Sequence, residues 1–482
     1  MKKSGKIFFL SVCCAAVAAA GLALTACGDK GDATAGLKPT EGLRYIPAPD
    51  EGEGYWVSGM GAAEVSELVI PSTYLDEPVT GVASSAFSDN KNLMKIVIPK
   101  SVKTIGAAAF EYSGLLEVAF SEGLEEIGQD AFVGCKMNKI DLPESLKTIG
   151  ESAFSYCRFL KEVNLPVKLE FLEEFSFSHS GLEIITVDEG NEKYYSENNC
   201  QIERETKTLI QGGAKSKIPD DVVAVGDFAF MGIAIESLTL PDSVVSLGQQ
   251  AFSGCNSLTA VTIPKQISSI EWGAFYQCEN LETVTLEEGM TFTGEYMFSG
   301  CGNLASLNLP STLKTIGESS FADCLDLETV TIPDSAETIG DHAFFGCYDL
   351  TNVKIGKNVK TICDYAFSKC SSLETITIPD SVETIGEGGF WYCEKLVNVK
   401  LGKNLKSIGG SAFKECFSLK KLVIPKSVEE IDNQAFYSYG DNTVYLFAEV
   451  EEGEAAWETS SYTTVYWAGE WEYRNGEPYP LE

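Results

Sequence analysis

Ten cysteines recur at one fixed place in a repeated motif, and cysteine offers this chain its widest choice of chemistry. Each stands three residues after a phenylalanine, as in "AFSGC" at Ala251–Cys255. A thiol there could form a disulfide, act as a nucleophile, or pack as a small apolar side chain. Equivalent positions of a repeat point their Cβ atoms the same way, which does not suit disulfide geometry, so we predict free, buried thiols. These cysteines are Cys135, Cys157, Cys255, Cys278, Cys301, Cys324, Cys347, Cys370, Cys393 and Cys416.

The remaining candidates for catalytic or metal chemistry are sparse. Cys200 and Cys363 lie outside the pattern and have no histidine near them in sequence, and the two histidines, His179 and His342, share no motif. The sequence contains no phosphate-binding loop, "HExxH" or calcium-loop spacing, and its carboxylates are scattered through turns. We therefore predict no catalytic residues, no metal site and no cofactor, and we expect the protein not to be an enzyme.

Cys27 has a chemistry of its own. Three lysines precede an uncharged apolar run from Ile7 to Ala26, which has the layout of an export signal. The run ends in "LTAC", Leu24–Cys27, which resembles the lipobox of bacterial lipoprotein signal peptides. The resemblance implies that residues 1–26 are removed and that Cys27 is lipidated. An uncleaved transmembrane anchor is the alternative, since about 20 apolar residues can span a bilayer. Residues 27–44 are small and polar, and we expect a flexible linker there.

The overall charge excludes one class of partner. The chain has 70 acidic and 36 basic residues, giving a formal net charge of −34. Such a surface repels phosphate backbones and anionic headgroups, so we expect no nucleic-acid binding and contact with the membrane only through the lipid anchor.

A repeat must position all of these residues. The motif phenylalanines, from Phe87 to Phe436, are 22 or 23 residues apart, except for one gap of 53 between Phe177 and Phe230. Within a unit, "LETVTIP" at Leu327–Pro333 alternates as a half-buried strand does, and proline ends it. The rest of the unit predicts an irregular or single-turn helical return. Because one unit cannot bury its apolar residues alone, the period predicts a solenoid with one short parallel strand per unit.

The unit "IGxxAFxxCxxLxxVxIPxSV" resembles the BspA-type, or treponemal-type, leucine-rich repeat found on surface proteins of host-associated bacteria. On this resemblance residues 45–80 form an N-terminal cap, 81–440 the leucine-rich repeat solenoid, and 441–482 a C-terminal cap. The long gap predicts a hairpin insert at about residues 184–214, because "CQIER" and "KTLIQ" alternate around "ETK".

Binding residues are predicted on the outward side of the strands. One polar position recurs in each unit and forms a row along the sheet. Aromatic residues in the returns, Trp391 and Tyr392, are a second candidate because their rings could stack on sugars. Strand propensity explains the threonines equally well, and core packing explains the rings. The candidate row comprises Thr285, Asn308, Thr331, Lys354, Thr377 and Lys400.

Together these features favour a non-catalytic protein lipid-anchored on the extracellular face of a bacterial membrane. The resemblance implies adhesion, with a host or bacterial surface macromolecule, protein or glycan, as partner. A glycan-binding accessory lipoprotein of a polysaccharide-uptake system and a structural envelope protein are the alternatives. We expect a monomer.

Overall fold

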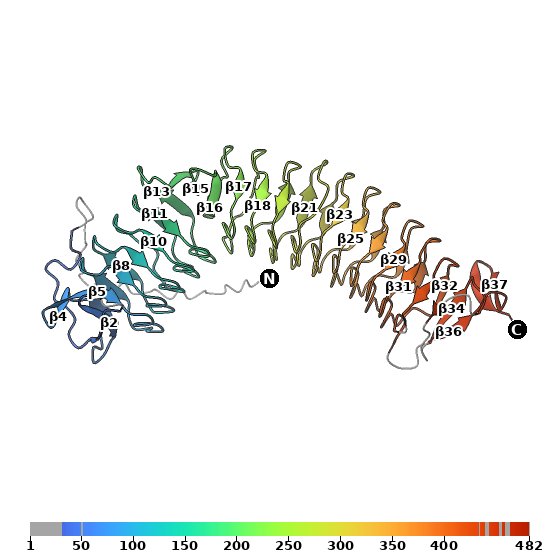
Figure 1. Ribbon diagram of the computed structural model, residues 1–482, viewed down its shortest axis with the longest axis horizontal. Coiled ribbons are helices and arrows are strands. Elements are labelled where there is room, and N and C mark those ends of the chain that lie inside the picture. Colours follow the sequence, from blue (N-terminus) through green and yellow to red (C-terminus); the bar gives the residue numbers. More distant parts are fainter. Residues whose placement is uncertain are drawn as a thin grey trace, which may run out of the picture.

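The protein is an open arc built by stacking short strands, as Figure 1 shows for the computed structural model. The structure describes residues 31–49, 52–432, 434–438, 443–452, 456–457 and 463–481. The predicted signal peptide and the lipidation site at Cys27 lie outside this range. The described residues form no helix, and therefore none long and apolar enough to cross a membrane. The predicted leucine-rich repeat solenoid is confirmed.

Most units contain the half-buried parallel strand that the sequence predicts. In β24, Val330 is buried while Thr329 and Thr331 are exposed. Its residues pair in parallel and in register with the next unit, so that Thr331 lies opposite Lys354. We call this column the long strands. They are β3 (Glu67–Val69), β6 (Lys95–Ile98), β8 (Glu117–Phe120), β11 (Glu162–Leu165), β13 (Ile184–Val187), β19 (Ala260–Ile263), β21 (Thr283–Leu286), β22 (Ser306–Asn308), β24 (Thr329–Thr331), β26 (Asn352–Lys354), β28 (Thr375–Thr377), β30 (Asn398–Lys400), β32 (Lys421–Ile424), β34 (Val444–Ala448) and β36 (Thr463–Tyr466).

The return of most units contains a second strand, which the sequence pattern did not predict. In β25 it is only Thr338–Ile339, and its isoleucine is buried. We call this parallel column the short strands. They are β5 (Glu77–Val82), β7 (Thr104–Ile105), β9 (Glu126–Ile127), β10 (Thr148–Ile149), β12 (Phe171–Leu172), β16 (Thr208–Gly212), β17 (Ala224–Val225), β18 (Ser246–Leu247), β20 (Ser269–Ile270), β23 (Thr315–Ile316), β25 (Thr338–Ile339), β27 (Thr361–Ile362), β29 (Thr384–Ile385), β31 (Ser407–Ile408), β33 (Glu430–Ile431) and β35 (Ala456–Trp457).

A tight turn, which we call the turn edge, carries each phenylalanine inward. Of the two forms expected for the return, irregular or single-turn helical, the structure has the irregular one, because residues on both sides of the phenylalanine have left-handed backbone. Around Phe344, His342 has φ 55° and Gly346 has φ 70°, whereas a right-handed helix needs negative φ throughout. Glycine adopts this conformation without a steric cost, and other residues do so at a cost of about 1–2 kcal/mol.

The core is one continuous cluster that runs the length of the arc. Its spine is a column of phenylalanine rings that stack from unit to unit, with centroids 5.3 Å apart for Phe344 and Phe367. The column runs from Phe87 to Phe177 and resumes from Phe230 to Phe436. These rings are at most 3% exposed, so each unit relies on its neighbours for burial, as a solenoid must.

The N-terminal cap begins with an antiparallel pair. β1 (Arg44–Pro47) pairs with β2 (Tyr55–Gly59), which joins the short-strand column through β5. A two-residue strand, β4 (Thr73–Tyr74), folds back on β5. The segment expected to be a flexible linker also contacts the solenoid: Ala33 N donates to Ser121 Oγ at 2.8 Å, and Thr40 N donates to Val69 O. Its hydroxyl and carboxylate side chains supply partners that a low count of hydrophobic residues concealed.

The C-terminal cap adds further layers to both columns before it closes. β34 and β36 extend the long strands, and the antiparallel hairpin β37 (Trp471–Arg474) and β38 (Glu477–Pro480) follows them. Two indole N–H groups hold the layers together, since Trp457 donates to Val428 O at 3.1 Å and Trp471 donates to Ala448 O at 2.8 Å.

The long gap holds the predicted hairpin. β15 (Cys200–Glu203) pairs antiparallel with β16, and β14 (Tyr194–Glu197) adds a third strand. β16 also pairs in parallel with β17, so the insert supplies one layer of the short-strand column. In Figure 1 it lies on the N-terminal limb of the arc.

Candidate functional site: the strand row and its groove

The structure lines up the predicted row of outward residues along the long strands. Thr285 lies opposite Asn308, Thr331 opposite Lys354, and Thr377 opposite Lys400. Thr285 is half-buried, and the other five side chains are exposed. The row consists of two runs, because β22 and β24 belong to separate sheets. Its C-terminal run, Thr331 to Lys400, spans four adjacent strands.

The two lysines of this run are free for an incoming partner. In the described part of the chain neither Lys354 nor Lys400 lies within ion-pair distance of a carboxylate. A second outward row beside it is also polar and uncharged, with Asn352 opposite Thr375 and Thr375 opposite Asn398. On a chain of formal charge −34, this face therefore presents two positive charges outside any ion pair, among hydrogen-bonding groups.

A groove that the sequence reading missed runs along the same units. It has a volume of about 700 Å³ and takes two residues from each of five units. One line of lining residues alternates hydroxyl and amide, and the other alternates acid and base. The lining residues are Ser335, Asn358, Ser381, Asn404 and Ser427 in the first line, and Glu337, Lys360, Glu383, Lys406 and Glu429 in the second.

The alternation follows a period of two units. Over four consecutive units the corner after the long strand is "PDS" in one unit and "GKN" in the next: the pair at Pro333 and Gly356 recurs 46 residues later at Pro379 and Gly402. Each glycine lies against the proline before it: a Cβ on Gly356 would be 2.0 Å from the carbonyl oxygen of Pro333. The 46-residue repeat is the sequence signal that could have revealed the groove.

Opposite charges on neighbouring units hold this surface together. Lys406 Nζ lies 2.5 Å from Glu383 Oε2, and Lys357 Nζ lies 2.7 Å from Asp334 Oδ2. The hydrogen bond and charge of Lys406, aided by the charge of Lys360, lower the pKa of Glu383. The carboxylate of Glu383 therefore stays ionised beside Lys406 at neutral pH. The alternating acidic and basic side chains can offer complementary charges to a partner along the groove.

The predicted aromatic residues lie elsewhere, on the turn edge. Trp391 and Tyr392 are half-buried, and their ring centroids are 5.1 Å apart. The indole of Trp391 also packs edge-on against Tyr365, and its N–H is buried. Tyr392 instead borders a small hollow of about 130 Å³, with Tyr348, Lys369, Ser371 and Glu394. The candidate residues thus divide between two edges of the solenoid.

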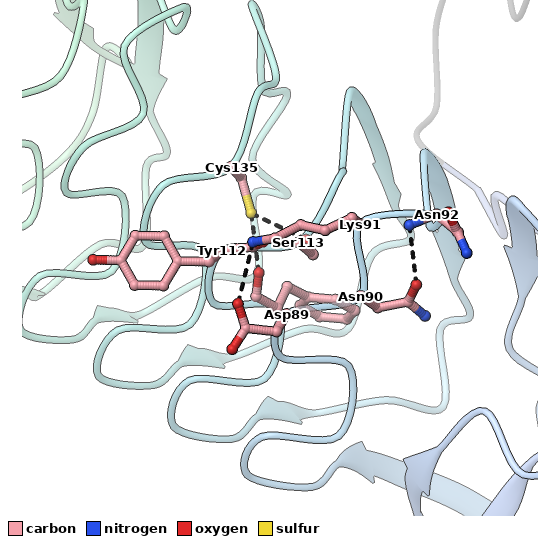
Figure 2. A network of polar contacts seen from close by, with 8 residues as sticks. Asp89, Asn90, Lys91, Asn92, Tyr112, Ser113 and Cys135 are labelled. Carbon is pink, nitrogen blue, oxygen red and sulfur yellow. Dashed lines mark hydrogen bonds and ion pairs between the residues drawn. The ribbon is translucent and has the colours of Figure 1, made fainter.

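The ten motif cysteines form a hydrogen-bonded ladder in two runs, Cys135 to Cys157 and Cys255 to Cys416. Every thiol donates to the carbonyl oxygen of the phenylalanine of the preceding unit, at 3.1–3.5 Å. Figure 2 shows the first of them: Cys135 Sγ also meets Ser113 Oγ at 3.4 Å, beside Lys91, which contacts Asp89 and the carbonyl of Tyr112. The cysteines are free and buried, as predicted.

Burial makes these thiols unreactive. It raises the pKa of Cys135 to about 11 and raises that of Cys157 well above its usual value. Since the thiolate is the nucleophile, they act as structural donors. His179 stacks on Tyr156, and burial lowers its pKa, while His342 stacks on Tyr365. Within the described ranges, no group of three or more His, Cys, Asp or Glu side chains could hold a metal ion.

The repeat and its stacked phenylalanines decide the family. The family model described as the BspA type leucine rich repeat region matches six copies, over residues 80–202, 214–328 and 314–442. This chain belongs to the BspA-type leucine-rich repeat family. No relative is found among curated proteins.

Solved structures of bacterial leucine-rich proteins are similar to this chain. A leucine-rich repeat protein from Eubacterium ventriosum has 22% identity and a TM-score of 0.53, over 73% of this chain and 93% of that one. A leucine rich cell surface protein from Faecalibacterium prausnitzii has 19% identity and a TM-score of 0.32, over 88% and 94% of the two chains. A Bacteroides ovatus leucine-rich repeat protein has 24% identity and a TM-score of 0.37, over 89% and 98%.

Proposed function

We propose that this BspA-type protein is lipid-anchored through Cys27 on the outer face of a bacterial membrane and binds a protein partner there without catalysis. The binding face comprises the C-terminal run of the row, Thr331 to Lys400, and the groove that follows it around the corner of each unit. The partner is a surface protein of the host or of another bacterium.

The observation that carries the proposal is the pair of unpaired lysines on a flat polar sheet. Lys354 and Lys400 are exposed, two strands apart, and surrounded by Thr and Asn side chains that can donate and accept hydrogen bonds. Such a face fits a broad, polar protein surface with acidic groups, and it predicts salt-sensitive association.

A glycan is the second candidate, and the hollow between Tyr348 and Tyr392 is the observation that favours it. Two tyrosines with a lysine, a serine and a glutamate between them provide ring faces and hydrogen-bonding groups for one sugar. Its small volume suits a single side chain or sugar ring and does not extend over several units.

The test uses the chain from residue 28 onward, which contains every residue that the structure describes. It is screened in parallel against matrix proteins, mucin and purified glycans. We expect binding to a protein, reduced at least about tenfold by the double substitution Lys354→Glu and Lys400→Glu, with a weaker dependence on salt. Lys136→Glu with Lys168→Glu is the matched control, because both lysines are exposed and lie far along the chain. Binding to glycans alone, abolished by Tyr392→Ala, would refute the protein preference.

A further inference from the structure

The insert gives the three edges of the solenoid unequal numbers of layers. On the short-strand edge, β16 forms a complete layer before β17. On the turn edge the insert is almost bypassed: His179 N donates to Met231 O at 2.9 Å, so the unit before the insert bonds directly to the unit after it. The rings of Phe175 and Phe228 meet there at 4.0 Å. A layer present on one edge and missing on another acts as a wedge.

The wedge also interrupts the phenylalanine column. The insert contributes no phenylalanine, and its place is taken by Gly212, where a Cβ would lie 2.0 Å from the ring of Phe230. Gly213 also passes close to the backbone of Glu183, whose carbonyl oxygen would lie 2.6 Å from a Cβ at this position.

The long-strand column is interrupted at the same layer of the stack. The sheet of β11 and β13 ends at β13, and the next sheet starts at β19. Between them, residues 236–240 read "ESLTL". This is the pattern of "ETVTL" at residues 282–286, which contain β21, yet residues 236–240 form no strand. None of the backbone hydrogen bonds found between described residues involves these five, although Leu238 and Leu240 still face the core.

A cleft opens beside this unpaired segment. Its volume of about 890 Å³ exceeds that of the groove, and its lining comes from both sides of the break. Buried apolar residues, among them Leu182, Phe230 and Ile235, form its floor. Its rim is polar, and there Glu183 holds Lys161 and Lys215 in ion pairs at 2.9 and 2.5 Å.

In the regular units, the backbone N–H and C=O groups of the residues equivalent to this segment point in a defined direction. There the outward residue of a long strand points its N–H and C=O toward the preceding unit. Thr283 N donates to Thr259 O, and Lys354 O accepts from Ile332 N at 2.9 Å. Ser237 and Thr239 occupy these outward positions in the broken unit, and the preceding side is the side of the cleft.

We propose that this cleft binds an extended peptide segment of a partner protein, which adds as the missing long strand beside residues 236–240. An added strand would satisfy the unpaired backbone groups of Ser237 and Thr239 and place alternate apolar side chains on the Phe230 floor. A glycan could contact the rim, but it cannot supply a ladder of regularly spaced amides. The site is separate from the strand row and does not rest on its function.

The test uses an array of hexapeptides that alternate apolar and polar residues. The array includes fluorescein-labelled LETVTI, the sequence of Leu327–Ile332 in a regular long strand. We expect members of the array to bind the chain from residue 28 onward in fluorescence anisotropy. N-methylation of every second residue, made in both registers, removes backbone donors but keeps the side chains. In one register it should lower affinity tenfold or more, which is the loss of about one hydrogen bond.

Ala234→Trp locates the site, because Ala234 is an exposed residue in the lining of the cleft. We expect it to abolish peptide binding, while the matched control Ala305→Trp, at an exposed alanine outside the cleft, does not. Lys354→Glu with Lys400→Glu should leave peptide binding unchanged, which separates this proposal from the proposed function. No binding across the array, equal binding after either N-methylation, or binding that survives Ala234→Trp would each overturn it. Glycan binding that Ala234→Trp abolishes, without any peptide binding, would assign the cleft to sugars.

Discussion

The thiol of Cys370 donates a hydrogen bond to the carbonyl oxygen of Phe344, 3.4 Å away in the preceding unit. That carbonyl also accepts the backbone N–H of Cys347, so one oxygen ties a turn to itself and to the next layer. The contact explains why a cysteine, and not only a small apolar residue, recurs at this place.

Removing one rung of this ladder should weaken the solenoid modestly. Cys370→Ala deletes a buried donor and the volume of a sulfur atom, and we expect a loss of about 1–2 kcal/mol in the free energy of unfolding. Urea denaturation followed by circular dichroism measures it. Cys370→Ser should cost less than Cys370→Ala, since it retains a donor. Equal effects of the two substitutions would show that the bond contributes nothing.

Thiol accessibility should separate Cys363 from the rest. Cys363 is half-buried, and burial, with the negative charges of Asp341 and Asp364, raises its pKa to about 11. In the native chain from residue 28 onward, only this thiol should react with an aromatic disulfide reagent, and its rate should rise until about pH 11. In the denatured, unreduced chain, all twelve thiols that the structure describes should react with the reagent. A count near zero would contradict the ladder of free cysteines.

The ion pairs of Glu183 should make stability depend on pH. Hydrogen bonds from Lys215 and Lys161 lower its pKa from 4.5 to about 2. A carboxyl whose pKa is depressed on folding contributes stability that is fully present above its unfolded pKa and is lost as the pH falls through the folded value. The difference in Tm between the wild type and Glu183→Gln should therefore be constant above about pH 5 and vanish toward pH 2. A difference that persists at pH 2 would assign the effect to packing.

Glycines at the corners should tolerate no side chain. Gly356→Ala places a methyl group 2.0 Å from the carbonyl of Pro333, and the backbone of two units must shift to admit it. We expect a loss of roughly 2–3 kcal/mol in urea unfolding. Gly302→Ala is the control, because the nearest atom to its Cβ would be a side-chain carbon of Leu325 at 3.7 Å. Similar losses for both variants would argue against the steric account.

The features that the sequence determined are those that repeat locally. The period of 22 or 23 residues, the inward phenylalanine and the alternation in "TVTI" are set by neighbouring residues, so the solenoid, its long strands and its buried thiols could be predicted. The second strand was not predicted because two residues, Thr338–Ile339, carry no periodicity. The sequence left the return open between an irregular and a helical turn because left-handed residues such as His342 have no signature in sequence.

Tertiary structure alone decided which layers meet at the insert. Nothing in the spacing shows that His179 bonds to Met231 across a 53-residue gap, or that residues 236–240 lose their strand partners there. Those outcomes depend on how the volume and layers of the insert match on three edges at once, which is a property of the stacked molecule. The repeat sequence sets the local conformation within each unit. Only the assembled stack determines where two neighbouring units fail to pair.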